Sequence, residues 1–366
     1  MDMQQNRMKE GLEKSSYAQN SLIQTNSIIK AFPVIKDALE ELYSNMTPKC
    51  VMVAELGCAT GPNTLKLMPE LVKSTYQTFR ARNRKDIPQI QIFLNDLYFN
   101  DFSTVSRSLP KFMKDLEKER DGDVGPLFIS MTPGSYRKRI FPDNFLHFVH
   151  CANSAHWLSK VPNALSNESG ESLTKGCLYL TDSSPPELVR AYHEQFAKDF
   201  ISFLECRAQE IVRGGRMVVN MMVSSETYPP QHMWVMKLMN IVLKDMLLQG
   251  LVDEKKVMSE FNIPFYPATM VEVNRLVSNE GSFSLHKHET FTLDWDMPEG
   301  DKMDVLKRAR FVAQTDRVAS EYMISTQFGE VFTDEFYRRF ADLIRQHLAA
   351  GYQLQTFHQV ISLIKK

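Results

Sequence analysis

The feature that most constrains the fold is an apolar run that ends in an acidic residue and a glycine-rich turn, residues 51–63, VMVAELGCATGPN. The apolar residues at its beginning predict a β-strand buried on both faces, as in a parallel sheet. Gly57 and Gly61 allow the backbone to turn tightly beneath a ligand, and Thr64 begins a helix. A strand, a tight loop and a helix in this order predict an α/β fold with a nucleotide site at the loop.

The spacing of these glycines narrows the class of ligand. The loop lacks the GxGxxG of dinucleotide sites and the Gly-Lys-Ser/Thr of phosphate-binding loops. A ligand without phosphate therefore fits better, and a glycine loop after an acidic strand end suits the amino-acid moiety of S-adenosylmethionine. A tight turn, as in any α/β protein, is the alternative for this motif alone.

A second predicted strand ends in a carboxylate. Ile90, Ile92 and Leu94 alternate with other residues, and Asp96 follows where an open α/β sheet places the carboxylate that binds a ribose diol. Taken alone, Asp96 is equally well explained as a helix cap or a turn residue. Together with the glycine loop, it favours a ligand that contains adenosine.

Composition excludes several classes of partner. The chain has 366 residues, 43% of them hydrophobic, enough to bury a core in one large domain with an insertion or in two medium domains. Its 43 basic and 44 acidic residues give no general attraction to nucleic acid or to membranes. The five cysteines lack CxxC spacing, and no signal peptide or membrane span is evident. We expect a cytoplasmic protein that acts on a small molecule.

Strands and helices alternate in the pattern of a largely parallel, doubly wound sheet. We expect strands at 50–56, 89–95, 126–131, 176–181 and 215–222, with later strands at 282–293 and 356–363. Between them, helical periodicity through Trp234, Leu238 and Met246 predicts a cap. The expected division is a core in 1–225, a helical cap in 226–280, and the last core strands in 281–366 with a further cap helix near 303–325.

Ordered blocks along nearly the whole chain carry a resemblance to a known family. They are SYAQNS (16–21), ELGCATGPNT (55–64), FLNDLYFNDF (93–102), PGSYRKRIFP (133–142), HFVHCANSAHWLSKVP (147–162), GGRMV (214–218), FNIP (261–264), EGSF (280–283) and QFGE (327–330). In these blocks the chain resembles the plant SABATH methyltransferases, which methylate small carboxylic acids or xanthine alkaloids with S-adenosylmethionine. The resemblance implies a Rossmann-like methyltransferase sheet, an α-helical cap and a homodimer.

The resemblance also implies the cofactor contacts. Tyr136 departs from the family, which usually has phenylalanine there, but its ring can still stack on adenine. Without the resemblance, Asn63 is explained as a helix cap and Ser135 as part of a turn. The implied cofactor residues are Ser16, Tyr17, Gly57, Cys58, Asn63, Asp96, Leu97, Ser135 and Tyr136.

A second set of side chains is implied to bind the methyl acceptor. In the carboxyl methyltransferases, a glutamine and a tryptophan hold the carboxylate, and here these are Gln24 and Trp157. Asn153 replaces a common tyrosine, and His156 adds a polar group, unless it is only a hydrogen-bonded wall residue. Dispersed polar partners suit a purine dione better than a single carboxylate. The implied acceptor residues are Tyr17, Gln24, Asn153, His156, Trp157, Trp234, Tyr266, Phe311, Thr315 and Ser320.

Three hypotheses of function follow. We favour an N-methyltransferase of xanthine alkaloids of the caffeine synthase type, for example converting theobromine to caffeine, because several blocks depart from the salicylate and jasmonate enzymes. The alternative is a carboxyl methyltransferase that makes methyl esters of salicylate, benzoate or jasmonate. The third is an inactive binding protein, which the intact glycine loop, Asp96 and Trp157 argue against.

The expected catalysis needs neither a nucleophile nor a metal. A sulfonium methyl is already activated, so Gln24, His156 and Trp157 would act by positioning the acceptor. Some family members bind Mg²⁺ near the FNIP block. Here Ser259 stands at the acidic ligand position and Thr174 at an expected asparagine, which argues against Mg²⁺.

Overall fold

The computed structural model describes residues 8–9, 16–60, 63–81, 87–118, 125–162, 173–174, 176–181, 184–224, 234–253, 261–295 and 304–366. In this part of the chain a seven-stranded sheet has the order β3-β2-β1-β4-β5-β7-β6. Strands β1 to β5 pair in parallel, and β7 runs antiparallel to both β5 and β6. The strands are β1 (Cys50–Leu56), β2 (Gln89–Asp96), β3 (Leu127–Pro133), β4 (Leu146–Ala152), β5 (Ile211–Met222), β6 (Phe283–Asp294) and β7 (Gln355–Lys365). The predicted Rossmann-like α/β fold is confirmed.

One predicted strand was wrong. The fourth strand is β4, and the described residues 176–181 form no strand, although Leu178 and Tyr179 belong to an apolar, β-prone run. Their backbone groups are paired elsewhere: Asn240 Oδ1 accepts from the N–H of Leu178 at 2.7 Å, and Ile263 N–H donates to the oxygen of Leu178 at 2.8 Å. The segment therefore joins the packing of the cap and does not enter the sheet.

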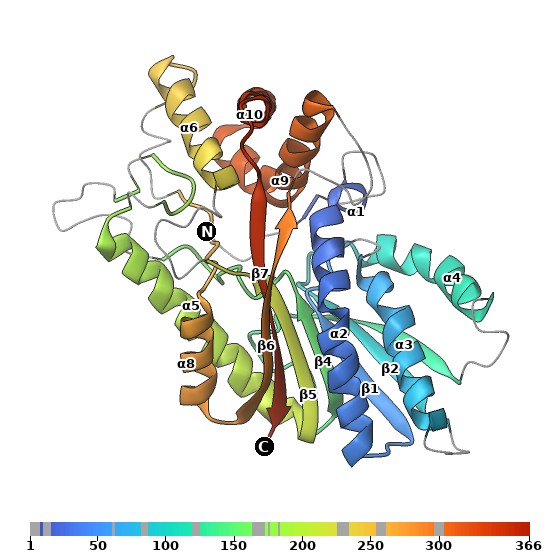
Figure 1. Cartoon of the computed structure of the whole chain (residues 1–366). Coiled ribbons are helices and arrows are strands. Elements are labelled where there is room, and N and C mark those ends of the chain that lie inside the picture. Colours follow the sequence, from blue (N-terminus) through green and yellow to red (C-terminus); the bar gives the residue numbers. More distant parts are fainter. Residues whose placement is uncertain are drawn as a thin grey trace.

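Helices cover both faces of the sheet (Figure 1). Helices α2 (Leu22–Asn45), α3 (Asn63–Ala81) and α4 (Phe102–Lys118) lie on one face, and α5 (Pro186–Glu210) and α8 (Met270–Glu280) lie on the other. Val51 and Val53 of β1 pack into the core beneath α2 and α3, whereas Ala54 and Leu56 pack into the core beneath α5. Burial on both faces explains why β1 has a continuous apolar sequence.

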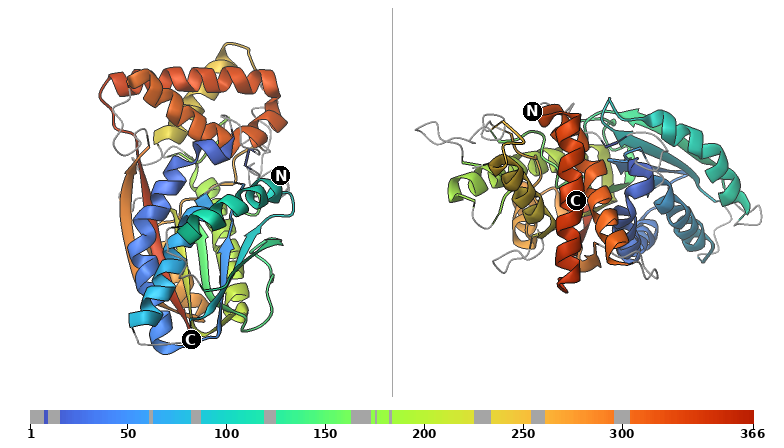
Figure 2. Two further views of the ribbon diagram at one scale, coloured as in Figure 1. Left: turned by 90° about the vertical axis from the view of Figure 1, so that its right-hand side faces the viewer. Right: turned by 90° about the horizontal axis from the view of Figure 1, so that it is seen from above.

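A further layer of helices lies beyond the carboxyl ends of the parallel strands (Figure 2). It contains α6 (Trp234–Leu248), α9 (Val305–Phe328) and α10 (Glu330–Ala349), with the short α1 (Tyr17–Asn20) close to it. Leu238, Val312 and Phe336 belong to the core of this layer. No helix in the described residues has both the length and the apolar character to cross a membrane. The predicted domain boundaries stay a prediction.

Candidate active site

The glycine turn after β1 is fixed by its backbone conformation and by close neighbours. Gly57 has φ of 79°, which glycine adopts most easily, and a Cβ added there would lie 2.0 Å from Ser154 Oγ. The N–H groups of Gly57 and Cys58 both donate to the backbone oxygen of Asn95 at 2.9 Å. The turn is therefore held against the end of β2 with no room for a side chain.

Asp96 ends β2 beside this turn and is partly buried. Its Oδ2 accepts from the N–H of Ala59, and its Oδ1 accepts from the N–H of Leu97, both at 2.7 Å. Burial raises the pKa of Asp96, and these two hydrogen bonds oppose the rise. Since each carboxylate oxygen can accept two hydrogen bonds, Asp96 keeps acceptor capacity for a pair of hydroxyls.

The turn and Asp96 line a cavity at the strand ends, here called the strand-end cavity. Tyr136 forms part of its wall, and its hydroxyl donates to the backbone oxygen of Ser154 at 3.0 Å. Of the predicted cofactor residues, Tyr17, Gly57, Asp96, Leu97 and Tyr136 line this cavity. Asn153 and Trp157, predicted as acceptor residues, also line it, and the lining residues that sequence reasoning missed are Met8, Ala59, Phe99, Asn100, Arg137, Ala152 and Ser154.

The other predicted cofactor residues, Ser16, Cys58, Asn63 and Ser135, are buried and do not line this cavity. The side chain of Asn63 is engaged by two residues at the beginning of α2: its Nδ2 donates to Ser21 Oγ at 2.8 Å, and its Oδ1 accepts from Thr25 Oγ1 at 2.5 Å. Asn63 therefore ties α3 to α2, and its contact with a cofactor stays a prediction.

A second cavity lies between the strand ends and the cap, here called the cap cavity. Met8, Tyr17, Asn153 and Trp157 line both cavities. A group that passes from one cavity to the other would cross at these four residues. The predicted acceptor residues on the wall of the cap cavity are Tyr17, Gln24, Asn153, His156, Trp157 and Thr315.

Three predicted acceptor residues do not line the cap cavity. The hydroxyl of Tyr266 donates to Glu272 Oε1 at 2.7 Å and thus points to α8. Phe311 is half-buried on α9. Ser320 Oγ lies 2.6 Å from the hydroxyl of Tyr337, in the packing between α9 and α10. A direct contact of these side chains with an acceptor stays a prediction.

The cap cavity also has wall residues that sequence reasoning missed. Most are apolar or aromatic, and in a sequence such residues cannot be told from ordinary core residues. Asp316 is the exception, because an acidic residue on the buried face of a helix is a recognisable signal. Trp234 begins α6, but its side chain lies outside the described residues. The missed residues are Met8, Ile23, Tyr179, Met222, Met236, Phe265, Trp295, Asp316, Ala319 and His358.

His156 is a neutral wall residue of the cap cavity. The N–H of Met222 donates to His156 Nδ1 at 3.1 Å, which leaves the ring proton of the neutral form on Nε2. Burial, together with the nearby His358, lowers the pKa of His156 to about 3. Its ring centroid lies 4.8 Å from that of Phe265. His156 therefore offers one N–H donor and no charge near pH 7.

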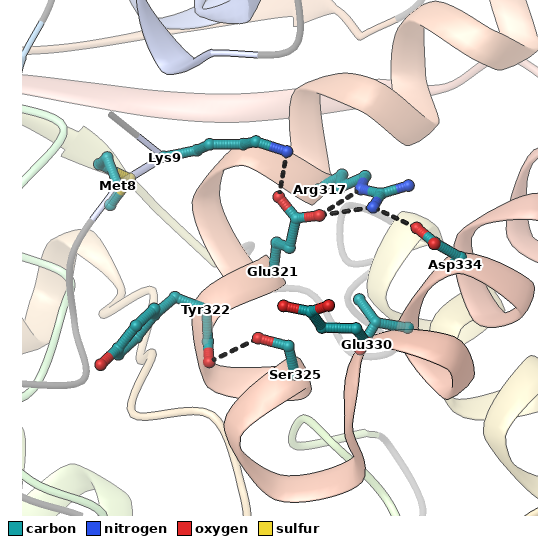
Figure 3. A pocket seen from close by; sticks show the side chains of 9 residues that line it. Met8, Lys9, Arg317, Glu321, Tyr322, Ser325, Glu330 and Asp334 are labelled. Atoms are coloured by element: carbon teal, nitrogen blue, oxygen red, sulfur yellow. Dashed lines mark hydrogen bonds and ion pairs between the residues drawn. The ribbon is translucent and has the colours of Figure 1, made fainter. Parts of the chain in front are cut away.

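A third pocket lies between Met8 and Lys9 on one side and helices α9 and α10 on the other (Figure 3). Lys9 Nζ pairs with Glu321 Oε2 at 2.8 Å, and Arg317 Nη2 pairs with Glu321 Oε1 and with Asp334 Oδ1, each at 2.5 Å. Met8 lies next to Lys9 and lines both the strand-end and the cap cavities. This ion-pair network thus ties Lys9 to α9, beside Met8 on the wall of the two cavities.

Both the sequence and the fold match known methyltransferases. A family model described as SAM dependent carboxyl methyltransferase matches residues 3–366. The chain belongs to this family, the SABATH methyltransferases. A probable jasmonic acid carboxyl methyltransferase 2 from Theobroma cacao is 37% identical over 376 residues, which cover 100% of this chain and 99% of that protein. A 3,7-dimethylxanthine N-methyltransferase 2 from Coffea arabica is 35% identical over 377 residues, which cover 98% and 96%.

The fold of this SABATH methyltransferase also matches a solved structure. Loganic acid methyltransferase with SAH is similar with a TM-score of 0.84 and 27% identity, over 98% of each chain. As a member of this family, the protein uses S-adenosylmethionine as methyl donor. The strand-end cavity fits this donor, because the turn at Gly57 has no side chain and Asp96 keeps acceptor capacity.

The structure tests the Mg²⁺ expectation only in part. Asn262 of the FNIP block accepts from the Tyr192 hydroxyl at 2.5 Å and donates from Nδ2 to the oxygen of Cys177 at 2.8 Å. Among the described residues, no three His, Cys, Asp or Glu side chains form a group that could hold a metal. Ser259 lies outside the described residues, so the expectation that Mg²⁺ does not bind stays a prediction.

Proposed function

We propose that this SABATH methyltransferase methylates a ring nitrogen of a xanthine alkaloid, in a reaction such as theobromine to caffeine. The observation that supports this most is the distribution of polar side chains in the cap cavity. Gln24 comes from α2, Asn153 and His156 follow β4, and Thr315 comes from α9. A purine dione has carbonyl and N–H groups on several edges. Hydrogen-bonding side chains on several walls therefore match it better than a single carboxylate-binding pair does.

Two of these polar groups lack a partner in the described structure. Gln24 Oε1 and Thr315 Oγ1 are buried and accept or donate no hydrogen bond. An unsatisfied buried polar atom costs about 1–3 kcal/mol, and most such atoms in proteins are satisfied. An acceptor molecule that supplies hydrogen bonds to both atoms would remove this cost.

The chain would catalyse the transfer by positioning. Bound S-adenosylmethionine would supply a methyl group that its sulfonium already activates and would become S-adenosylhomocysteine, and the methylated ring N–H would lose its proton to solvent. Asn153 Nδ2 donates to the oxygen of Gln24 at 3.3 Å, and its Oδ1 accepts from Ser27 Oγ at 3.0 Å, so the amide is fixed between the cavities. Trp157 lies on the same shared wall, and the Nε2–H of His156 can donate to a carbonyl of the acceptor.

A substrate panel tests the proposal. Purified protein with methyl-labelled S-adenosylmethionine should transfer label to theobromine or 7-methylxanthine, and chromatography should identify the N-methyl product. Transfer to salicylate, benzoate or jasmonate, with none to any xanthine, would refute it.

The alternative is a carboxyl methyltransferase, which two observations favour. Gln24 and Trp157, the implied carboxylate-binding pair, line the same cavity. The relative from Theobroma cacao is named as a probable jasmonic acid carboxyl methyltransferase. The same panel separates the two proposals, because mild alkali releases methanol from a methyl ester and leaves an N-methyl group intact.

We also propose that the protein is a homodimer and acts in the cytoplasm, as the family resemblance implies. The chain has a mass of 42.2 kDa, so light scattering should give twice this mass. A monomer at micromolar concentration would contradict the homodimer.

A further inference from the structure

Asp316 is an acidic side chain on the wall of the cap cavity. It is 6% exposed and lies on the buried face of α9, among Val312, Ala313 and other residues of the cap core. Within the described residues that line this cavity, it is the only acidic side chain, and none is lysine or arginine. The acceptor molecule would therefore meet one carboxyl group and no cation from these residues.

The carboxyl group of Asp316 is poorly satisfied by its neighbours. Ser320 Oγ lies 3.3 Å from Asp316 Oδ2, but it also lies 2.8 Å from the backbone oxygen of Asp316. The serine hydroxyl has one proton, and the shorter contact takes it, while the Tyr337 hydroxyl can donate to Ser320 Oγ at 2.6 Å. Asp316 is thus left with unused acceptor capacity.

The charged residues nearest to Asp316 in the sequence do not balance its negative charge. Arg317 follows Asp316, but its guanidinium pairs with Glu321 and Asp334 in the outer pocket (Figure 3). Among the described residues, Asp316 forms no ion pair. A buried carboxylate without a cation or a full set of donors is costly, so a ligand that brings a donor is favoured at this place.

Burial raises the pKa of Asp316 to about 7. Two titratable groups from other elements lie near it, Tyr179 in the segment before α5 and Tyr337 of α10, and burial together with the charge of Asp316 raises the pKa of both. Both phenols are therefore neutral near pH 7, and neither reduces the negative charge at this wall.

We propose that Asp316 selects the acceptor by taking a hydrogen bond from a ring N–H that is not methylated in the reaction, such as one of the two in 7-methylxanthine, and by disfavouring an acceptor that is a carboxylate. The inference rests on the proposed function and deepens it, since it names the edge of the acceptor that the enzyme recognises. It makes Asp316 a specificity-determining residue that contacts the acceptor and leaves the methyl donor to the strand-end cavity.

Calorimetry on the complex with S-adenosylhomocysteine tests this inference, at about pH 8.5, where a carboxyl group with a pKa of about 7 is charged. Theobromine has a ring N–H and caffeine has none, so the wild-type protein should bind theobromine about 10- to 100-fold more tightly, the range of a hydrogen bond to a charged group. Asp316→Asn should reduce this preference to within about threefold. It should also strengthen the binding of salicylate or jasmonate relative to wild type.

A matched control and a second variant complete the experiment. Asp342→Asn removes an exposed carboxylate on α10 and should leave the preference unchanged. If Asp316→Asn does not fold, as seen by circular dichroism, Asp316→Ser replaces it. If the wild type binds theobromine but the folded variant keeps the preference, Asp316 does not recognise the N–H. If the wild type binds carboxylates and no xanthine, the proposed function fails instead.

Discussion

Asp96 Oδ2 accepts a hydrogen bond from the N–H of Ala59 at 2.7 Å, and this contact joins the end of β2 to the glycine turn after β1. Ala59 has φ of 51°, in the left-handed region, so the hydrogen bond fixes a backbone that few non-glycine residues adopt. The oxygen of Ala59 accepts from Asn100 Nδ2 at 2.9 Å. One carboxylate thus supports the turn and retains capacity to bind a ligand.

Asp96→Asn should weaken the binding of S-adenosylhomocysteine about 10- to 100-fold, because an amide has one acceptor oxygen where the carboxylate has two. Calorimetry measures this directly. Asp101→Asn, at the beginning of α4, is the control and should bind normally. Unchanged affinity in Asp96→Asn would show that Asp96 supports only the turn.

Gly57→Ala should destabilise the protein, because the new Cβ would lie 2.0 Å from Ser154 Oγ. Gly281→Ala is the matched control: Gly281 has φ of 83°, but nothing lies within 4 Å of an added Cβ. The control should lose about 1 kcal/mol from backbone strain alone, and Gly57→Ala about 2 kcal/mol more. Urea unfolding measures both. Equal losses would mean that Ser154 moves freely away.

Trp157→Ala should abolish or strongly reduce acceptor turnover while leaving cofactor affinity nearly intact. Trp157 lies on the wall that the two cavities share, so its loss opens the place where the acceptor must be held. The KM values for both substrates separate the effects. A loss of S-adenosylhomocysteine binding as large as the loss of turnover would mean that Trp157 serves chiefly the strand-end cavity.

Asp316→Asn should make the protein more stable above pH 7. Burial raises the pKa of Asp316 to about 7 in the folded state, above about 4 in the unfolded chain, so folded protein holds this proton more tightly. The wild type therefore loses stability as the pH rises from 4 to 7, and the variant does not. The difference in unfolding free energy should grow from near zero at pH 4 to roughly 2–4 kcal/mol at pH 8.

Two buried histidines make the free energy of unfolding change with pH in the opposite direction. This contribution cancels when the variant is compared with the wild type. Burial lowers the pKa of both His156 and His358 to about 3, so each costs stability as the pH falls below about 6.5. Both are present in wild type and in Asp316→Asn. A variant-to-wild-type difference that does not change with pH would contradict the raised pKa of Asp316.

The part of the site that could be predicted from sequence is local. Gly57 and Asp96 follow strands whose apolar patterns are plain, and parallel strands bring their carboxyl ends together. By contrast, the prediction of a strand at 176–181 failed because Asn240, far along the chain, satisfies the backbone of that segment. The strand propensity of a segment does not show whether a distant side chain will bind its backbone groups in place of a neighbouring strand.

Only part of the wall of the cap cavity could be predicted, because residues far apart in the chain meet there. Gln24 and Trp157 were found through the family resemblance, but Trp295 and His358 reach the cavity from β-strand ends whose place depends on the whole fold. Asp316 is different, since a charge on the apolar face of α9 is visible in the sequence.

The most direct test is a crystal structure of the protein with S-adenosylhomocysteine and theobromine. We expect the nucleoside beside Gly57 with its ribose hydroxyls on Asp96, and the xanthine beneath α9 with a ring N–H toward Asp316. Nucleoside density away from the turn at Gly57, with the strand-end cavity empty, would contradict the account.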